Sequence, residues 1–528
     1  MPFDEEEIKT AEDHLLVPWL KRIDYLDSLS HIIYEASLIV GVTGQGKTHQ
    51  TSKVIVPELF KRGKRFVIVS APSHGILNKD LFDSYISKDA SGKKIKFIYA
   101  NEWKDFEEAR NYFWNGESVL LITIHPLLTR FGKRLLHTLS KCSPNNFSII
   151  IDEAHSWLVP DPKLYKGDRG HNGAKYKASL YKLLCKMETN YIFKLTATPT
   201  NSQLGKLLHD GKLKVKIINK LPPKKLTIDR LACLNKKMFY DPDISGDIDR
   251  SFNGDKRIRL SDVEKKVLMM LKDMRELELE TGAKQTMLIR TGISTSKEFY
   301  TKPNIVKNMV KGLVKLAGFD PTELILGITT EGGQHMESAS GKNSQDVIND
   351  IQLQKHFDDP DHPVRIMLVI NKCYQGMSVN SIKNVVVWRT TSTEDSSGDP
   401  ITDFGMQVIG RGNRPYAGRH KLKNHTFDSL KHLPLEEKKG IIKLNSLNFL
   451  LPNTFNYHTI AQMFSDTMIS TKEEFTEYFL DGESNIEHIC EEDPCIRCGG
   501  TGVEPKDNII DDDNFDGIEE ELQIENFD

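Results

Sequence analysis

The chain has 528 residues, which is too long for one hydrophobic core, so two to four domains are expected. Charged residues make up 27% and apolar residues 38%, and no apolar run approaches the roughly 18 residues that cross a bilayer, so no membrane role is expected. The net charge is −3, but residues 507–528 hold ten acidic residues and no basic one, which leaves +7 on residues 1–506 and permits nucleic-acid binding.

Residues 1–30 are predicted to be an N-terminal extension. The extension opens with "MPFDEEEIKTAEDH", which is acidic where a secretory signal would be basic and then apolar. We therefore expect the protein to stay in the cytoplasm, and in the host cytoplasm if the protein is viral. The seven cysteines do not form the pattern of a disulfide framework.

Residues 31–220 alternate short β-branched runs with helical stretches, which is typical of a parallel α/β sheet. The candidate strands are "SLIVGV", "RFVIVSA", "KFIYAN", "SVLLITI", "FSIIID" and "IFKLTAT". "NKLPPKKL", at residues 219–226, carries two prolines and no core pattern, so residues 221–255 are predicted to be a linker.

A phosphate-binding loop is predicted in "GVTGQGKTHQ", residues 41–50, which fits G-x-x-x-x-G-K-[ST] between a strand and a helical stretch. Glycines let backbone N–H groups face the phosphates of ATP, a lysine reaches the β and γ phosphates, and a threonine hydroxyl can hold Mg²⁺. The alternative is a glycine-rich turn. The predicted ATP-binding residues of the loop are Gly41, Thr43, Gly44, Gln45, Gly46, Lys47 and Thr48.

Two carboxylates end the apolar strand in "FSIIIDEAH". Such a pair can divide the work of phosphoryl transfer, because one carboxylate positions Mg²⁺ while the other polarises the attacking water. We assign Asp152 to the metal, together with Thr48, and Glu153 to the catalytic base. The alternative is an acidic turn that caps a helix.

A second α/β domain is predicted over residues 256–435. A long helix begins at Ser261, which has capping-box spacing to Glu264, and Gly282 can end the helix. Strand patterns then recur in "QTMLIRT", "ELILGIT", "RIMLVIN" and "NVVVWRT". The expected fold class is therefore α/β, with two tandem domains of parallel sheets flanked by helices.

Five segments together resemble a known group of motors. "GQGKT", "DEAH", "LTATPT", "RIMLVINKCYQGMSV" and "QVIGRGNRP" resemble motifs I, II, III, V and VI of the superfamily 2 helicases and translocases. This resemblance implies two RecA-like domains with ATP between them. It also implies catalytic roles for Arg411 and Arg414, because arginines opposite a γ-phosphate stabilise the charge of the transition state. The resemblance also implies further site residues. These are Gln407 for ATP binding, and His155, Thr196, Thr198, Gly376 and Ser378 for coupling to nucleic acid.

Within the superfamily, the chain resembles the motor portion of type I restriction R subunits and phage recombination-type helicases. Ser378 departs from the aspartate of many relatives, so the coupling contact at that position is open. No glutamine precedes Gln45, so the upstream glutamine that reads adenine in DEAD-box RNA helicases is missing.

The C-terminal region, residues 436–506, contains a candidate zinc knuckle in "HICEEDPCIRCGGTG". Thiolates two residues apart can grip one tetrahedral Zn²⁺ ion, and a histidine can complete the set. The alternative is a group of reduced surface thiols. The candidate ligands are His488, Cys490, Cys495 and Cys498.

The acidic tail, residues 507–528, has a charge density that disfavours packing, so we expect it to be disordered. It either maintains solubility or binds a basic protein partner. Overall, the sequence predicts an ATP- and Mg²⁺-dependent DNA helicase or duplex DNA translocase that acts on single- or double-stranded DNA. The alternatives are an RNA helicase and a nucleotide-gated scaffold that does not move strands.

Overall fold

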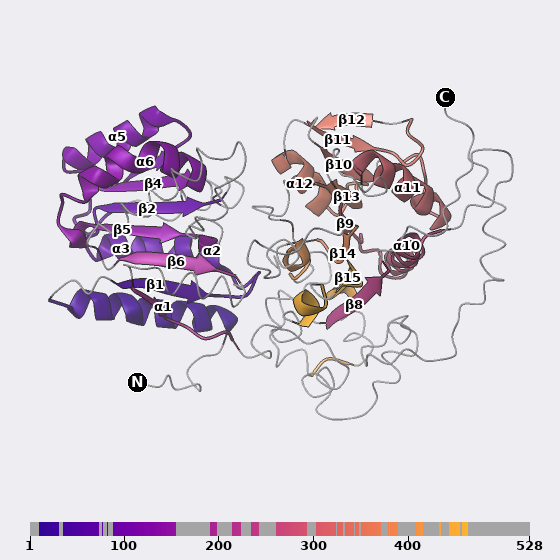
Figure 1. Cartoon of the computed structure of the whole chain (residues 1–528), viewed down its shortest axis with the longest axis horizontal. Helices are drawn as coiled ribbons and strands as arrows, with labels where there is room; N and C mark the ends of the chain where they lie inside the picture. The colour runs from indigo at the N-terminus through magenta and orange to yellow at the C-terminus, as the bar shows by residue number, and fades with distance from the viewer. Residues whose placement is uncertain are drawn as a thin grey trace. The chain divides into compact units, whose positions relative to one another are not determined.

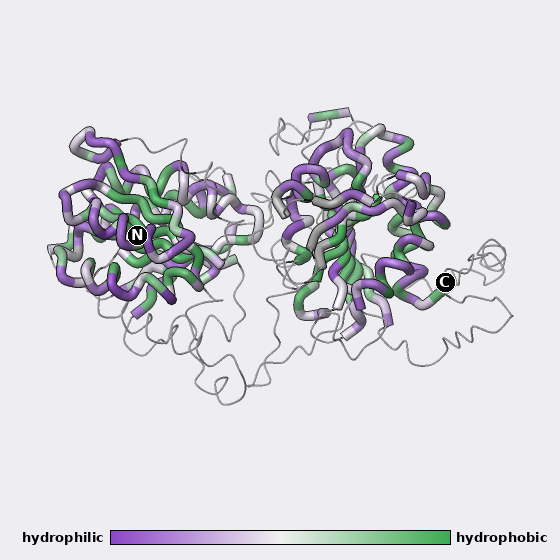
Figure 2. Tube along the Cα trace, turned by 90° about the horizontal axis from the view of Figure 1, so that it is seen from above, coloured by the Kyte–Doolittle hydropathy of each residue, from purple (hydrophilic) through white to green (hydrophobic). Residues whose placement is uncertain are grey.

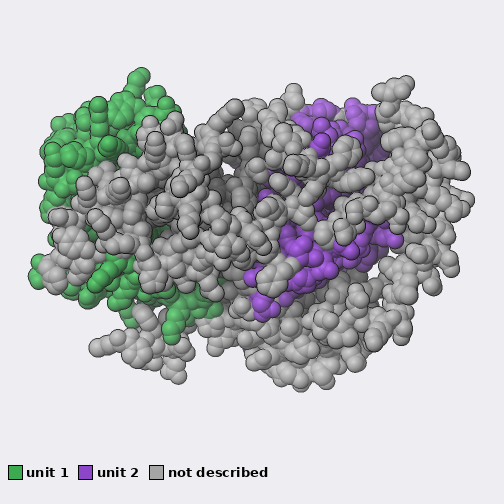
Figure 3. All heavy atoms as spheres, viewed as in Figure 1, with its two compact units in different colours: residues 1–227, 375–378, 394–403 green, residues 228–374, 379–393, 404–528 purple. Residues whose placement is uncertain are grey.

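The chain forms two compact units in the computed structural model, and each is described by itself (Figure 3). Unit 1 comprises Met1–Thr227, Gln375–Ser378 and Glu394–Asp403, and unit 2 comprises Ile228–Tyr374, Val379–Thr393 and Phe404–Asp528. The structure describes residues 10–30, 35–72, 77, 82, 88–154, 189, 191–197, 214–222, 234–241, 260–292, 302–323, 325–330, 333–342, 344–347, 350–370, 379, 381–388, 408–414, 432–434, 443–454 and 457–462.

Unit 1 is built on a parallel sheet with the strand order β3-β4-β2-β5-β6-β1-β7 (Figure 1). The strands are β1 (Glu35–Val40), β2 (Phe66–Ala71), β3 (Lys96–Tyr99), β4 (Val119–Ile124), β5 (Phe147–Ile151), β6 (Ile192–Thr196) and β7 (Lys214–Ile217). Every neighbouring pair is parallel. The loops that follow these strands therefore meet at one edge of the sheet.

Helices cover both faces of this sheet, so its strands are apolar on both sides (Figure 2). In β2, Phe66 and Ile68 pack toward α5 (Trp103–Trp114) and α6 (His125–Leu139), while Val67 and Val69 pack toward α1 (Ala11–Ser28) and α3 (Val56–Lys61). The helical segments of unit 1 are α1 (Ala11–Ser28), α2 (Lys47–Gln50), the π-helix η2 (Thr51–Ile55), α3 (Val56–Lys61), α5 (Trp103–Trp114), α6 (His125–Leu139) and the 3-10 helix η3 (Pro144–Asn146).

Helix α1 lies within the predicted N-terminal extension and packs into the core of unit 1. Leu15, Trp19 and Ile23 are each fully buried, one turn apart along the helix. Arg22 also ties the helix to β1, because its Nε donates to Ser37 Oγ at 3.0 Å and its guanidinium pairs with Glu35. The helix therefore belongs to the same core as the strand that leads into the phosphate loop.

Unit 2 has a larger sheet with the strand order β12-β11-β10-β13-β9-β14-β15-β8. The strands are β8 (Leu234–Tyr240), β9 (Met287–Arg290), β10 (Leu326–Thr330), β11 (Gly333–Glu337), β12 (Ser344–Val347), β13 (Ile366–Val369), β14 (Asn384–Val387) and β15 (Ser446–Pro452). The pairs β10-β11 and β11-β12 at one edge of the sheet are antiparallel, and every other neighbouring pair is parallel. Strands β15 and β8 lie next to each other at the other edge of the sheet. In the sequence, β8 precedes and β15 follows the range 256–435 that was predicted as the second domain.

Helix α10 (Asp262–Thr281) has the capping residues that the sequence predicts. Ser261 and Glu264 form a reciprocal capping box, and Gly282 ends the helix with a φ of 63°. Helices α11 (Pro303–Leu316) and α12 (Asp350–Asp358) also flank the sheet. No helix among the described residues is long and apolar enough to cross a membrane.

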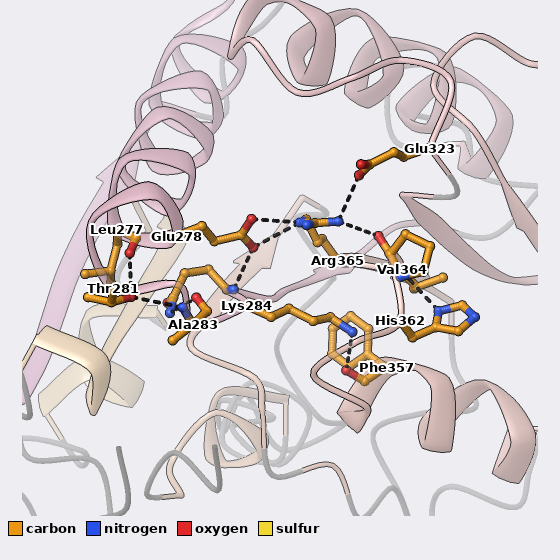
Figure 4. Close-up of polar contacts among 12 residues, drawn as sticks. Leu277, Glu278, Thr281, Ala283, Lys284, Glu323, Phe357, His362, Val364 and Arg365 are labelled. Atoms are coloured by element: carbon orange, nitrogen blue, oxygen red, sulfur yellow. Dashed lines mark hydrogen bonds and ion pairs between the residues drawn. The ribbon is translucent and has the colours of Figure 1, made fainter. Parts of the chain in front are cut away.

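Polar contacts join α10, α12 and β13 at the edge of the second sheet where the parallel strands β9 and β13 begin (Figure 4). The buried ammonium group of Lys284 donates to the carbonyl oxygen of Phe357 at 3.0 Å, so it caps the end of α12. Burial, with the charge of Arg365 nearby, lowers the pKa of Lys284 to about 8. Arg365 Nε lies 3.0 Å and 2.9 Å from the two carboxylate oxygens of Glu278 on α10. These contacts fasten α10 and α12 to the amino edge of the second sheet.

Candidate functional site

The phosphate loop follows β1 and leads directly into α2. Gly44 and Gly46 have φ values of 93° and 92°, which side chains rarely adopt, so both positions favour glycine. The backbone N–H of Gly41 donates to the carbonyl oxygen of Thr196 at the end of β6, at 3.0 Å. Thr196 therefore lies beside the loop, and its coupling role stays a prediction.

Gln45 ties the loop to itself and to α1. Its Oε1 accepts from the N–H of Val42 at 3.0 Å, and its Nε2 donates to the carbonyl oxygen of Ala11 at 2.5 Å. The side chain is fully buried. A Cβ on Gly41 would lie 2.7 Å from Gln45 Oε1, so the glutamine leaves room only for glycine there. Gln45 shapes the loop through its amide group, and its assignment to ATP binding stays a prediction.

Lys47 lies over the loop. Its ammonium group donates to the carbonyl oxygens of Gly41 at 2.9 Å and Val42 at 3.3 Å, and the residue is 8% exposed. The cation is thus held above the turn formed by the loop, where phosphate oxygens would bind to the backbone N–H groups of a helix N-terminus. This placement fits the predicted role of Lys47.

Thr48 and Asp152 meet although 104 positions separate them in the sequence. Thr48 Oγ1 donates to Asp152 Oδ2 at 3.2 Å, and Asp152 is buried at the carboxyl end of β5. A hydroxyl and a carboxylate are the hard oxygen ligands that Mg²⁺ prefers, and Mg²⁺ usually keeps several waters beside such a pair. The donor set therefore fits Mg²⁺, with Thr48 and Asp152 as the residues that would hold the ion.

The two carboxylates differ in their surroundings. Burial, together with the negative charge of Glu153, raises the pKa of Asp152 to about 6, and the nearby Lys47 acts in the opposite direction. Glu153 has a φ of 49°, and its backbone N–H donates to Asp152 Oδ1 at 2.9 Å. A non-glycine residue in the left-handed region costs free energy, and such positions cluster at active sites. This turn places the carboxylates of the adjacent residues Asp152 and Glu153 together after the end of β5.

Replacing Asp152 by asparagine is expected to stabilise the metal-free protein at pH 7.5. The pKa of Asp152 is raised in the folded state, so the protonated carboxyl group stabilises the folded protein. This contribution to stability is full below the ordinary pKa of 3.8 and is lost as the pH rises through about 6. The amide side chain of the variant would carry no charge to bury. Thermal unfolding should show a midpoint a few degrees above wild type at pH 7.5 and no gain near pH 4. A lower midpoint for the variant at pH 7.5 would contradict this electrostatic interpretation.

Arg411 and Arg414 lie in unit 2, in a short helical segment and the turn after it. Val408 and Ile409 anchor the segment in the core, and the buried Lys383 donates to the carbonyl oxygen of Arg414. Both arginines are of intermediate exposure, and burial lowers the pKa of Arg414 while the charge of Asp358 acts in the opposite direction. The segment therefore presents two cations from a fixed backbone.

Gly412 lets this arginine segment pack against the sheet. A Cβ there would lie 2.4 Å from Leu447 Cδ1 and 3.1 Å from Val385 Cγ2. We expect Gly412→Ala to lower the free energy of unfolding of unit 2 by about 1–3 kcal/mol through overpacking. Gly312 in α11 has open space around it, so Gly312→Ala should instead stabilise by about 0.5–1 kcal/mol. Denaturant unfolding would measure both, and equal effects would argue against the packing role of Gly412.

Several predicted site residues lie outside the described residues. These are His155, Thr198, Gly376, Ser378 and Gln407, the candidate zinc ligands His488, Cys490, Cys495 and Cys498, and the acidic tail. Within the part of the chain that the structure describes, no three His, Cys, Asp or Glu side chains are arranged to hold a metal ion.

One contact in the site was not predicted. His125, the first residue of α6, is buried and lies 2.9 Å from the carbonyl oxygen of Asp152 through its Nε2. The segment "ITIHPLL" places this histidine directly after a strand, but only the strand order shows that it reaches the acidic pair.

Comparison with known families gives one match in the first unit. Residues 25–201 match the model described as the res subunit of type III restriction enzymes. The matched range contains the phosphate loop, the acidic pair and Thr196. No curated protein sequence matches the chain significantly.

Three solved structures are similar to this chain. The ATP-dependent type ISP restriction-modification enzyme LlaBIII bound to DNA superposes with a TM-score of 0.50 at 13% identity, covering 93% of this chain and 34% of that one. The Lhr helicase of Mycobacterium smegmatis bound to single-stranded DNA and AMP-PNP has a TM-score of 0.45 at 12% identity, covering 87% and 48%. The MrfA helicase bound to DNA and AMPPNP has a TM-score of 0.45 at 12% identity, covering 100% and 61%.

The chain spans between 34% and 61% of the lengths of these three proteins. The predicted α/β fold with tandem RecA-like units is confirmed. The C-terminal region, residues 436–506, lies largely outside the described residues. The family match covers the part of unit 1 that carries the phosphate loop and the acidic pair, and the geometry there fits an ATP-hydrolysing enzyme. The particular resemblance to type I R subunits and phage helicases stays a prediction.

Proposed function

We propose that the protein is an ATP-dependent DNA helicase or duplex DNA translocase. The observation that carries this proposal is the contact between Thr48 and Asp152, which joins the phosphate loop to the acidic pair at the carboxyl edge of one sheet. A second α/β unit carries the paired arginines on a fixed segment. Hydrolysis that requires groups from two units makes ATP turnover depend on their relative movement.

Each residue of the candidate site has a distinct task. The backbone N–H groups of the loop and the ammonium group of Lys47 bind the phosphates of ATP. Glu153 accepts the proton of the water that attacks the γ-phosphorus, while the bond to the β,γ-bridging oxygen breaks and ADP leaves. Arg411 and Arg414 stabilise the charge that develops on the phosphate oxygens during this step. When Mg²⁺ is bound by Thr48 and Asp152, it supplies neutralisation of phosphate charge.

DNA is the proposed track. The net charge of +7 over residues 1–506 favours a polyanion, and contacts to phosphates make such binding dependent on salt and weakly dependent on sequence. LlaBIII, the structure with the highest TM-score of the three compared above, is described as ATP-dependent and bound to DNA. These observations support DNA, with RNA as the alternative track.

ATPase assays with a panel of nucleic acids test this function. Steady-state hydrolysis would be measured with no nucleic acid and with single-stranded DNA, duplex DNA and RNA of equal length at fixed salt. We expect DNA to stimulate turnover by at least about tenfold, a difference of about 1.4 kcal/mol in activation free energy. Stimulation by RNA alone would identify an RNA helicase. Equal rates with and without every nucleic acid would favour the nucleotide-gated scaffold.

The C-terminal region carries two further proposals. We propose that residues 507–528 bind a basic protein partner or compete with DNA, and that residues 488–498 bind Zn²⁺. Deleting the tail should strengthen DNA binding at fixed salt if it competes, and unchanged binding would exclude competition. Metal analysis of protein expressed with ample zinc should find one zinc per chain, whereas metal-free protein would exclude the knuckle.

A further inference from the structure

His125 connects three strand ends at the carboxyl edge of the first sheet. It follows β4 directly and is 3% exposed. Its Nδ1 lies 2.8 Å from Ser70 Oγ in β2, and its Nε2 lies 2.9 Å from the carbonyl oxygen of Asp152 after β5. Because β2 lies between β4 and β5 in the sheet, the imidazole reaches across one whole strand to the acidic pair.

The chemistry of these partners determines which ring nitrogen carries the proton. The carbonyl oxygen of Asp152 can only accept, so the Nε2 of His125 must donate to it. In the neutral imidazole the Nδ1 is then an acceptor, and the hydroxyl of Ser70 donates to it. Both ring nitrogens are thus used by partners on the two neighbouring strand ends.

The same pair of strand ends is closed by a backbone bond. The N–H of Asp152 donates to the carbonyl oxygen of Ser70 at 2.8 Å. The peptide groups on both sides of the Asp152 Cα are therefore held, one through Ser70 and the other through His125. The carboxylate of Asp152 accepts from the backbone N–H of Glu153 through Oδ1 and from the hydroxyl of Thr48 through Oδ2.

We propose that His125 is a positioning residue for the metal site, which orients Asp152 through its backbone carbonyl without contacting the metal or the nucleotide. This inference rests on the proposed Mg²⁺ site of Thr48 and Asp152 and deepens it. Groups that hold metal ligands in place typically affect metal affinity or activity by about 10- to 100-fold when they are removed. The expected consequence is a weaker metal site on an intact fold.

Two replacements separate the hydrogen bonds from the packing. His125→Phe keeps an aromatic ring of similar size but leaves the hydroxyl of Ser70 and the carbonyl of Asp152 without their partner. His125→Gln keeps one donor and one acceptor on a single side chain. His137→Phe serves as the matched control, because His137 is an exposed histidine in the last turn of the same helix.

The test is a titration of Mn²⁺ into each protein with ADP present, following free Mn²⁺ by electron paramagnetic resonance. We expect His125→Phe to raise the Mn²⁺ dissociation constant by about 10-fold or more, while His125→Gln and His137→Phe stay close to wild type. Equal Mn²⁺ affinity in wild type and His125→Phe would overturn the proposal, and so would a loss in His125→Gln as large as in His125→Phe.

The titration is independent of motor activity. If wild-type protein binds Mn²⁺ with ADP but shows no ATPase stimulation by nucleic acid, the proposed helicase function fails while the role of His125 is still decided by the variants. If His125→Phe does not fold, Ser70→Ala replaces it, because this variant removes the hydroxyl that holds Nδ1 of His125. Weaker Mn²⁺ binding in Ser70→Ala is then expected, and unchanged Mn²⁺ affinity would overturn the proposal.

Discussion

Replacing Lys47 by alanine is expected to lower ATP turnover by at least about 100-fold, the loss typical of removing one charge-stabilising donor from an active site. The ammonium group is buried over the phosphate loop and donates to the carbonyl oxygens of Gly41 and Val42. Without it, the loop loses the cation that balances the charge of the β and γ phosphates. Steady-state hydrolysis and binding of a fluorescent ATP analogue would measure the effect.

Lys53 provides the matched control for this replacement. It lies in η2, within the same helical stretch, and its side chain is exposed. Lys53→Ala should therefore leave turnover and nucleotide binding close to wild type. Turnover in Lys47→Ala within a few-fold of wild type, with both proteins folded by circular dichroism, would refute the assignment of the loop.

Replacing Glu153 by glutamine is expected to lower turnover by about 10²–10⁴-fold while nucleotide binding is retained. Glutamine preserves the size of the side chain and the backbone with its φ of 49°, but it cannot accept the proton of the attacking water. The variant should therefore accumulate with ATP bound. Single-turnover hydrolysis, with ATP binding measured separately, distinguishes the loss of chemistry from the loss of affinity.

Glu117→Gln is the control for the acidic replacement. Glu117 precedes β4 at the opposite, amino edge of the sheet, where it pairs with Lys96. Its replacement should leave hydrolysis unchanged. If Glu153→Gln instead weakened ATP binding and kept the rate of the bound complex, Glu153 would be a binding residue and the general base would have to be another group.

Most apolar strands of the two sheets were predicted, because strands that are buried on both faces are apolar throughout, but the equally buried β15 was not. Runs such as "RFVIVSA" and "RIMLVIN" carry that signal in their composition alone. Polar strands were missed for the opposite reason, although the edge strand β3 was predicted: β7 is short, charged and mostly exposed, and the β11-β12 hairpin is largely polar. Helix α1 was missed because Pro18 lies inside it, and an interior proline normally argues against a helix.

The candidate site was predictable in its residue types and less so in its supports. Lys47, Thr48 and Asp152 follow from local patterns, and the structure brings them together at one edge of the sheet. The bond from Gln45 to Ala11 and the reach of His125 depend on which helix and which strands become neighbours. Strand order is a tertiary property, so no local pattern in the sequence predicts these contacts.

Directed movement on DNA is the most direct test of the proposed motor. A third strand bound to a duplex at a defined distance from its end would report movement by its displacement, measured by fluorescence after ATP is added. We expect displacement that requires hydrolysable ATP, lags longer as the distance grows, and is absent in Lys47→Ala. ATP hydrolysis stimulated by DNA with no displacement of either a third strand or a complementary strand would contradict the motor and favour a nucleotide-gated scaffold.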